Sequence, residues 1–415
     1  MRDTSFSITK AIAIIMVVMG HACVPGWICR FIYQFHVPVF FICAGYFFNT
    51  RYLNDEKTYL MRRIKGLYLP FLRWSLLFLL LHNLLFPLGL LSEQFGNNDG
   101  GVLHPYTWTE FSRRLFSIVF NMSGYDEFLA GSFWFFRSLF VASLLFLILF
   151  KVLRRFKPAL TDTQAGQAIL GLSFLATLWL VGADFRIAGL AGGGYRELLG
   201  VCFFSVGFLF RVYRERVPLG WPLALGCLLV AVLGASKFPS SMGHHATLAQ
   251  FFSLLPPAVA GFGMVYILSL KLSRHTNFLT TSLSYIGNNT LYIFAFHLLA
   301  FKLVSAIKVG VYHLPWEMVG GHTVVNTHPD DYFWVLYTIV GVALPLGVRE
   351  LYRYYAARYT FTYGTIGRYA LKYLLQFLFL IGAALKWLIR AIRDTAVGIW
   401  RGIQEIISAS NPKDE

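Results

Sequence analysis

The 415-residue chain is 57% hydrophobic and 13% charged, whereas a soluble globular protein carries roughly 25% charged residues. This composition excludes an ordinary soluble enzyme and indicates a polytopic membrane protein. The formal net charge of +16 does not indicate a nucleic-acid partner, because the basic residues cluster in short stretches between apolar runs.

Apolar runs recur along the chain, and a helix needs roughly 20 apolar residues to cross a bilayer. We therefore expect an all-α fold with about ten spans, of which the first two are short and joined by a short outer loop that holds Cys23 and Cys29. The runs interleave without a soluble domain, so residues 1–355 form one membrane domain. The predicted spans fall near 8–23, 36–50, 67–90, 132–151, 167–183, 196–213, 219–236, 248–270, 283–306 and 332–352.

The charge of the connections predicts the orientation of the spans. Lys and Arg are concentrated in alternate connections, and basic connections lie on the cytoplasmic side of a membrane. Both termini are then cytoplasmic. The basic stretches are 51–66, 151–157, 211–216, 271–274 and 349–358; the outer connections, 91–131, 184–195, 237–247 and 307–331, are poorer in Lys and Arg for their length.

Residues 356–415 form a C-terminal extension. Lys372, Lys386, Arg390 and Arg393 follow helical spacing on one face, opposite a face rich in leucine. This pattern predicts an amphipathic helix on the cytoplasmic leaflet. An eleventh span near residues 369–390 is the alternative.

Ionisable side chains inside predicted spans are the candidates for chemistry, because their burial in a membrane is costly. His21 ends the first span and His36 opens the second, and imidazole is the side chain best able to exchange protons near neutral pH. In the predicted orientation the outer half holds His21, His36, His82, Arg137 and His297, and the inner face holds Lys10, Arg62, Arg63, Lys65 and Arg73. This layout suits a buried site that meets an anionic ligand from inside and a polar partner from outside.

Each candidate also has a purely structural interpretation. His82 can simply bond a neighbouring helix, and His36, before Val-Pro, can cap a helix start. Arg137 keeps its charge and needs a partner, so an internal ion pair is as good an interpretation as a substrate contact. No Cys or His spacing is typical of a metal site, so we expect no metal.

Several stretches resemble the acyltransferase 3 family of membrane-bound acyltransferases that modify surface glycans. The resemblance covers nearly all of residues 1–355 and agrees with ten spans. It rests on Arg2 with Ile8 to His21, on Phe35 to Phe48, on Arg62 to Pro70, on Phe133-Trp134-Phe135, and on Ile286 to His297.

This resemblance implies an acyl-CoA, usually acetyl-CoA, as cytoplasmic donor and the hydroxyl of an extracytoplasmic carbohydrate as acceptor, in a bacterial inner membrane. His21 matches the family's essential histidine, and Lys10 matches its basic position near the inner end of the first span. Many members have an acidic residue where this chain has Ser7. The salt bridge that such a residue makes to Lys10 is therefore missing.

On this basis we expect His21 to act as a general base, or else as a transient acyl carrier. Arg137, Asn289 and His297 are expected to polarise the thioester or orient the acceptor, and His36 and His82 to lie on the acceptor side. The expected ligands of the CoA phosphates are Lys10, Arg62, Arg63, Lys65 and Arg73. The alternative is a glycan exporter or flippase, or a proton-coupled transporter, without acyl transfer. The acceptor, the acyl chain length and the oligomeric state are not predicted.

Overall fold

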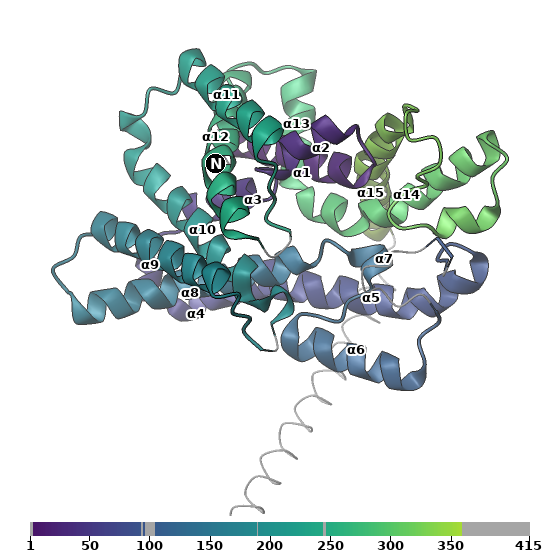
Figure 1. Cartoon of the computed structure of the whole chain (residues 1–415), viewed down its shortest axis with the longest axis horizontal. Coiled ribbons are helices and arrows are strands. Elements are labelled where there is room, and N and C mark those ends of the chain that lie inside the picture. The colour runs from purple at the N-terminus through teal and green to yellow at the C-terminus, as the bar shows by residue number, and fades with distance from the viewer. Residues whose placement is uncertain (1–2, 93, 96–103, 189, 244–245, 359–415) are drawn as a thin grey trace, which may run out of the picture. The chain divides into compact units, whose positions relative to one another are not determined.

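A computed structural model describes residues 3–92, 94–95, 104–188, 190–243 and 246–358, and every regular element among them is helical (Figure 1). The chain divides into two compact units, Met1–Gly347 and Val348–Glu415. The second unit begins within the last helix, α15 (Phe333–Arg358). The amphipathic helix that we predict in the extension 356–415 lies outside the described residues.

Before α15, the chain forms fourteen α-helices and several short helical turns among the described residues. The helices are α1 (Thr4–His21), α2 (Gly26–Tyr33), α3 (Pro38–Tyr46), α4 (Glu56–Arg63), α5 (Leu69–Leu85), α6 (Trp108–Asn121), α7 (Glu127–Ala130), α8 (Trp134–Phe156), α9 (Asp162–Gly182), α10 (Tyr195–Tyr213), α11 (Trp221–Lys237), α12 (Leu248–Leu272), α13 (Phe278–Asn288) and α14 (Thr290–Val311).

In the described part of the chain, eight helical stretches are long and apolar enough to cross a membrane. The all-α polytopic class is thus confirmed. Two predicted spans are not among the eight: α10 carries Arg196 and Glu197 in its first turn, and α11 has only 17 residues. The count of ten and the cytoplasmic termini stay predictions.

The second span differs from its prediction. Its helical stretch runs from Gly26 to Tyr46 and is broken between α2 and α3, so most of the expected outer loop is helical. Pro38 explains the break, because it lacks a backbone N–H and fits only the first turn of a helix. The break places His36 between the two helices.

The third span is longer than its prediction. Asp55 caps α4, and the helix continues through a π-helical turn at Ile64–Tyr68 into α5. The stretch Glu56–Leu88 is therefore one helical unit of 33 residues. Of the basic residues that we assigned to a connecting segment, Lys57, Arg62, Arg63 and Lys65 lie instead on its first turns, and Arg51 lies in a short helical turn before it.

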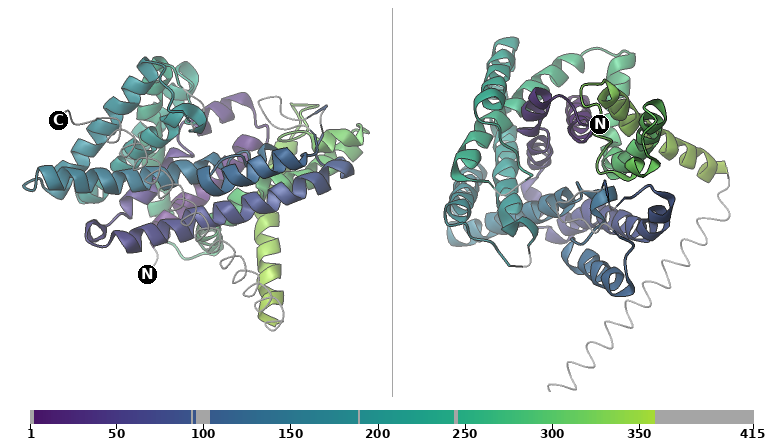
Figure 2. Two further views of the ribbon diagram at one scale, coloured as in Figure 1. Left: turned by 90° about the horizontal axis from the view of Figure 1, so that it is seen from below. Right: turned by 45° about the vertical axis from the view of Figure 1, so that its right-hand side comes forward.

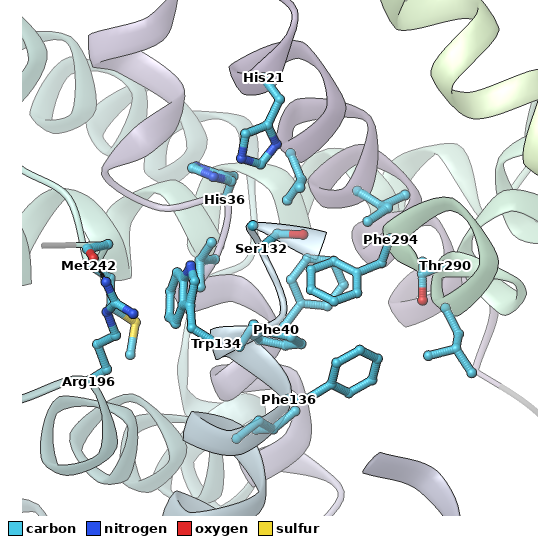
Figure 3. Close-up of a pocket in the computed structure, with 18 of the residues that line it drawn as sticks. His21, His36, Phe40, Ser132, Trp134, Phe136, Arg196, Met242, Thr290 and Phe294 are labelled. Atoms are coloured by element: carbon cyan, nitrogen blue, oxygen red, sulfur yellow. Dashed lines mark hydrogen bonds between the residues drawn. The ribbon is translucent and has the colours of Figure 1, made fainter. Parts of the chain in front are cut away.

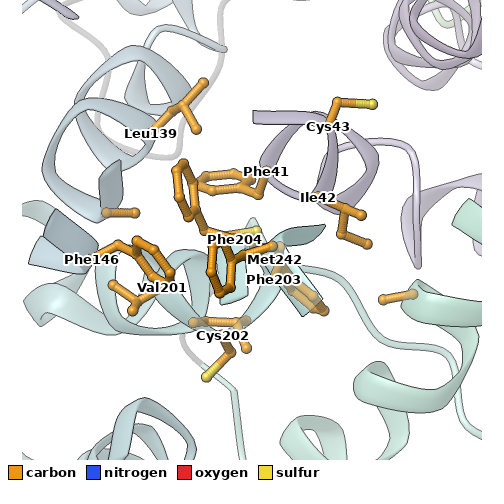
Figure 4. Packing of buried hydrophobic residues seen from close by; sticks show 14 of the residues in the cluster. Phe41, Ile42, Cys43, Leu139, Phe146, Val201, Cys202, Phe203, Phe204 and Met242 are labelled. Atoms are coloured by element: carbon orange, nitrogen blue, oxygen red, sulfur yellow. The ribbon is translucent and has the colours of Figure 1, made fainter. Parts of the chain in front are cut away.

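Close contact between α3 and α10 holds one part of the core together. A Cβ atom at Gly45 would lie 1.8 Å from the Phe204 carbonyl oxygen, and one at Gly207 would lie 1.9 Å from that of Ile42. Small residues let helix backbones approach in this way. Phenylalanine rings fill the space beside the contact, with Phe146 and Phe204 at 4.9 Å between centroids (Figure 4).

Helix α1 packs against α3, α12, α13 and α14, and both views of Figure 2 show the N-terminal helices among the teal and green ones. At Gly287 of α13, an added Cβ would lie 1.7 Å from the Ser7 carbonyl oxygen, so the two backbones touch. Asp3 caps α1, accepting from the backbone N–H of Ser5 at 3.0 Å. This packing fixes the helix that carries Lys10 and His21.

Candidate active site

One cavity of about 860 Å³ lies beside α1. Lys10 and His21 both line it, and eleven residues along one helix place them roughly 16 Å apart. His36, Ser132 and His322 also line the cavity, and Figure 3 shows His36 and Ser132 near His21. The cavity is therefore long enough to hold two groups that meet near His21.

His21 contacts a second histidine. Its Nδ1 lies 3.2 Å from Nε2 of His297 on α14, and the ring centroids are 5.1 Å apart. His297 is fully buried, whereas His21 is half-buried and lines the cavity. The pairing of these two residues, 276 positions apart, comes from the contact between α1 and α14.

The hydrogen bonds of His297 determine which ring nitrogen of His21 is free. Nδ1 of His297 lies 3.0 Å from the carbonyl oxygens of Ile293 and Phe294, which can only accept, so this nitrogen carries a hydrogen. A fully buried imidazole is most stable when neutral. Nε2 of His297 then accepts from Nδ1–H of His21, which leaves the lone pair of His21 on Nε2. This assignment is inferred from the bonding network.

His36 presents a second imidazole to the cavity. Its Nδ1 donates to the Ile32 carbonyl at 2.6 Å, so its lone pair is also on Nε2. Tyr33 packs edge-on against its ring at 4.9 Å and donates to the Gly20 carbonyl at 3.0 Å. The break between α2 and α3 thus positions His36 next to the end of α1, and Figure 3 shows it beside His21.

A segment that follows α14 covers the His21 end of the cavity. Nζ of Lys302, a buried residue of α14, donates to the carbonyls of Val319 at 3.1 Å and Gly321 at 2.7 Å. The hydroxyl of Thr323 donates to the His21 carbonyl at 2.7 Å. These bonds hold His322 at the cavity wall.

His322 is one of the cavity residues that the sequence analysis missed, as are Ser132 and Arg196. Burial lowers its pKa to about 4, with Lys302 and His21 adding to the effect. Its Nδ1 is buried without a partner in the protein. The residue lies in an irregular segment after two glycines, where no periodicity assigns it to a face, so the sequence holds no signal for its position.

Three phenylalanine rings pack together on the cavity wall. Phe135 packs against Phe40 at 5.7 Å and against Phe294 at 5.4 Å between ring centroids. All three line the cavity. We call Phe40, Phe135 and Phe294 the aromatic cluster.

Two of the predicted site residues lie in buried pairs and do not line the cavity. Arg137 bonds Glu197 at 2.9 Å, which is the ion pair that we considered as its alternative. His82 is fully buried, with Nδ1 at 2.5 Å from Asp126 and Nε2 at 2.8 Å from the His104 carbonyl. These partners agree with the structural interpretation of each residue given above.

The other predicted residues divide as follows. Asn289 donates to the Tyr285 carbonyl at 2.7 Å at the junction of α13 and α14, and its neighbour Thr290 lines the cavity in its place. Of the basic residues expected to bind phosphate, Lys10 lines the cavity. The other four do not line it. Arg62 donates to the Tyr52 hydroxyl, and Lys65 lies in the π-helical turn. The guanidinium groups of Arg63 and Arg73 lie over the rings of Tyr59 and Trp74.

Within the described ranges, no three His, Cys, Asp or Glu side chains are grouped so that they could hold a metal ion. The cavity instead offers nitrogen lone pairs at His21 and His36 and a hydroxyl at Ser132. It is equipped to accept a proton from a ligand.

Comparison with known proteins adds one finding. A family model described as an acyltransferase domain matches residues 3–350. No curated protein and no solved structure matches the chain. The matched range contains every residue that lines the cavity.

Proposed function

Because this chain belongs to the acyltransferase 3 family and is a multi-pass membrane protein, we propose that it transfers an acyl group, most simply acetyl, from a cytoplasmic acyl-CoA to a carbohydrate hydroxyl on the other side of a bacterial inner membrane. The observation that carries the proposal is the free Nε2 of His21 in the cavity, with Nδ1 held by His297.

In the proposed reaction, Nε2 of His21 takes the proton of the acceptor hydroxyl as its oxygen attacks the thioester carbonyl. The C–O bond forms, the C–S bond breaks, and the proton passes from His21 to the departing thiolate. A positioned base contributes roughly 10²–10⁴-fold to such a step. The Ser132 hydroxyl, buried without a partner in the protein, is available to donate to the thioester oxygen.

The donor would enter from the Lys10 end of the cavity. Of the basic residues expected to bind phosphate, Lys10 lines the cavity, and we place a CoA phosphate there. The phosphates of CoA stay outside the bilayer, so the acyl group must reach His21 on an extended arm. The length of the cavity along α1 supports this route.

The test is acetyl-CoA binding and thioester cleavage by purified protein in detergent, with wild type beside His21→Ala. We expect saturable binding by both proteins and cleavage by the wild type alone. The matched control is His275→Ala, which removes an exposed histidine in the connection between α12 and α13 and should leave both readouts unchanged.

Two outcomes would contradict the proposal. Near-normal cleavage by His21→Ala would remove the general-base role. Failure of the wild type to bind any short acyl-CoA would favour the exporter or transporter.

A further inference from the structure

The cavity has a side branch that the proposed reaction does not use. Trp134 begins α8 and Arg196 lies in the first turn of α10, and both line the cavity together with Met242 and Gly243. Figure 3 shows Arg196, Trp134 and Met242 on one side of the view and Thr290 on the other, with the histidines above. We call the region lined by Trp134, Arg196 and Gly243 the side branch.

The guanidinium of Arg196 is held in place but only partly satisfied. It lies over the Trp134 ring, with Cζ 4.4 Å from the centroid, and one N–H donates to the Gly243 carbonyl. Its Nε is buried without a partner in the protein. A buried donor left unsatisfied destabilises the fold, so this geometry favours a ligand that accepts from Arg196.

The neighbouring charges leave the side branch with a net positive charge. Glu197, next to Arg196 in the chain, bonds Arg137 at 2.9 Å. Glu127 also lines the cavity but pairs with Arg114 at 3.3 Å, and burial raises its pKa. Glu197 also acts on Arg196, but the three arginines outnumber the two carboxylates, and the region keeps a net positive charge.

The geometry points to a carboxylate as the missing acceptor and to a sugar as its carrier. A guanidinium offers parallel N–H donors that match the two oxygens of a carboxylate. The half-buried Trp134 ring offers a flat apolar surface of the kind on which the apolar face of a sugar ring packs, and Glu127 can bond hydroxyl groups. On the proposed function, the acceptor enters on this side.

We propose that the side branch binds an acidic sugar unit of the acceptor glycan, with its carboxylate on Arg196 and its ring against Trp134. This inference rests on the proposed function only in assuming that the bound sugar is the acceptor. The binding site itself does not require acyl transfer, and a binding experiment therefore tests it independently.

The experiment compares methyl β-D-glucuronoside with methyl β-D-glucoside, which differ only in a carboxylate or a hydroxymethyl group at one carbon. Binding of each to the detergent-purified full chain is followed by saturation-transfer NMR titration. We expect the wild type to bind the glucuronoside at least tenfold more tightly than the glucoside. Arg196→Gln should reduce this preference to within about twofold, and Arg196→Lys should restore part of it.

Arg113→Gln is the matched control, because it removes a positive charge from an exposed position of α6 in the same predicted outer region. It should keep the full preference. Thermal unfolding of each variant reports whether the fold is intact, and Arg196→Lys keeps the test informative if Arg196→Gln unfolds.

Equal binding of the two glycosides, no detectable binding of the glucuronoside, or a preference that survives Arg196→Gln would overturn the inference. Acetyl-CoA cleavage in the same preparations tests the proposed function separately. A carboxylate preference without cleavage would support the side branch and contradict the acyltransferase mechanism; cleavage without the preference would do the reverse.

Discussion

At the residue scale, the proposed role of His21 as a base depends on His297, which holds its ring in one tautomer. His297 fixes the hydrogen of His21 on Nδ1 only because its own Nδ1 is bound to two carbonyls. An isolated imidazole would exchange between two tautomers, and only one of them exposes a lone pair at Nε2. In the proposed reaction, His297 is thus a positioning residue, a role that its place in the sequence did not distinguish from substrate contact.

We predict that His297→Ala lowers kcat for acyl transfer by about 10- to 100-fold, less than the roughly 10²–10⁴-fold expected from loss of the base itself. KM for acetyl-CoA should change little, because His297 does not touch the donor route. Steady-state kinetics of the purified variant would check this. An unchanged kcat would show that the tautomer of His21 is set by another group.

A second prediction concerns His322 and pH. Its pKa in the folded protein, about 4, lies below the ordinary value of 6.5, so the unfolded chain binds more protons between these limits. The neutral ring therefore contributes stability that is fully present above pH 6.5 and is lost as the pH falls toward 4. Lys302, His21 and Asp126 are the charged or titratable groups that act on it.

Thermal unfolding of wild type and His322→Asn, measured at several values between pH 7 and pH 4, would check this. The melting temperature of the wild type should fall more steeply with acid than that of the variant. Parallel curves would mean that the pKa of His322 is the same in the folded and the unfolded protein, and would contradict the prediction.

At the scale of elements, the short helix α7 is held by one carboxylate. Asp126 caps it through the Leu129 N–H at 2.9 Å and also accepts from Tyr106 at 2.5 Å, with His82 Nδ1 at 2.5 Å. Residues 131 and 132, which follow α7, line the cavity. The cluster therefore connects α5 and α6 to the cavity wall.

Asp126→Ala should lower the free energy of unfolding by about 3–5 kcal/mol, since it removes one member of a buried pair. Asp55→Ala is the matched control: Asp55 also caps a helix, but it is exposed, and its loss should cost about 1 kcal/mol. Unfolding in mixed SDS and detergent micelles would measure both. Equal losses would show that the His82 and Tyr106 contacts add nothing.

The elements also show what the sequence could predict. Apolar length located the helices well, because a membrane span must satisfy its own backbone hydrogen bonds. It missed α2 and the continuation of α4 into α5, since a break at Pro38 and a π-helical turn are local departures within apolar or basic runs. Whether Arg137 and His82 face the cavity or a buried partner depended on Glu197 and Asp126, which lie 60 and 44 residues away.

At the scale of the whole molecule, the orientation across the membrane is still a prediction from the basic connections. Cys23 lies at an exposed position after α1, on the predicted outer side, and Lys157 is exposed after α8, on the predicted inner side. In cells that produce single-cysteine variants, a membrane-impermeant maleimide should label Cys23 at once. It should label Lys157→Cys only after permeabilisation. The reverse pattern would invert the topology.

Under the proposed function, the cavity receives one substrate from each face of the membrane and therefore interrupts the electrical insulation of the bilayer. A potential of 100 mV acts on each elementary charge in its path with about 2.3 kcal/mol, and an open water-filled route past His21 would let protons run down it. The aromatic cluster of Phe40, Phe135 and Phe294 puts apolar rings on the wall of this cavity. In the proposed protein, we expect these three side chains to oppose a continuous file of water and so to limit proton leak.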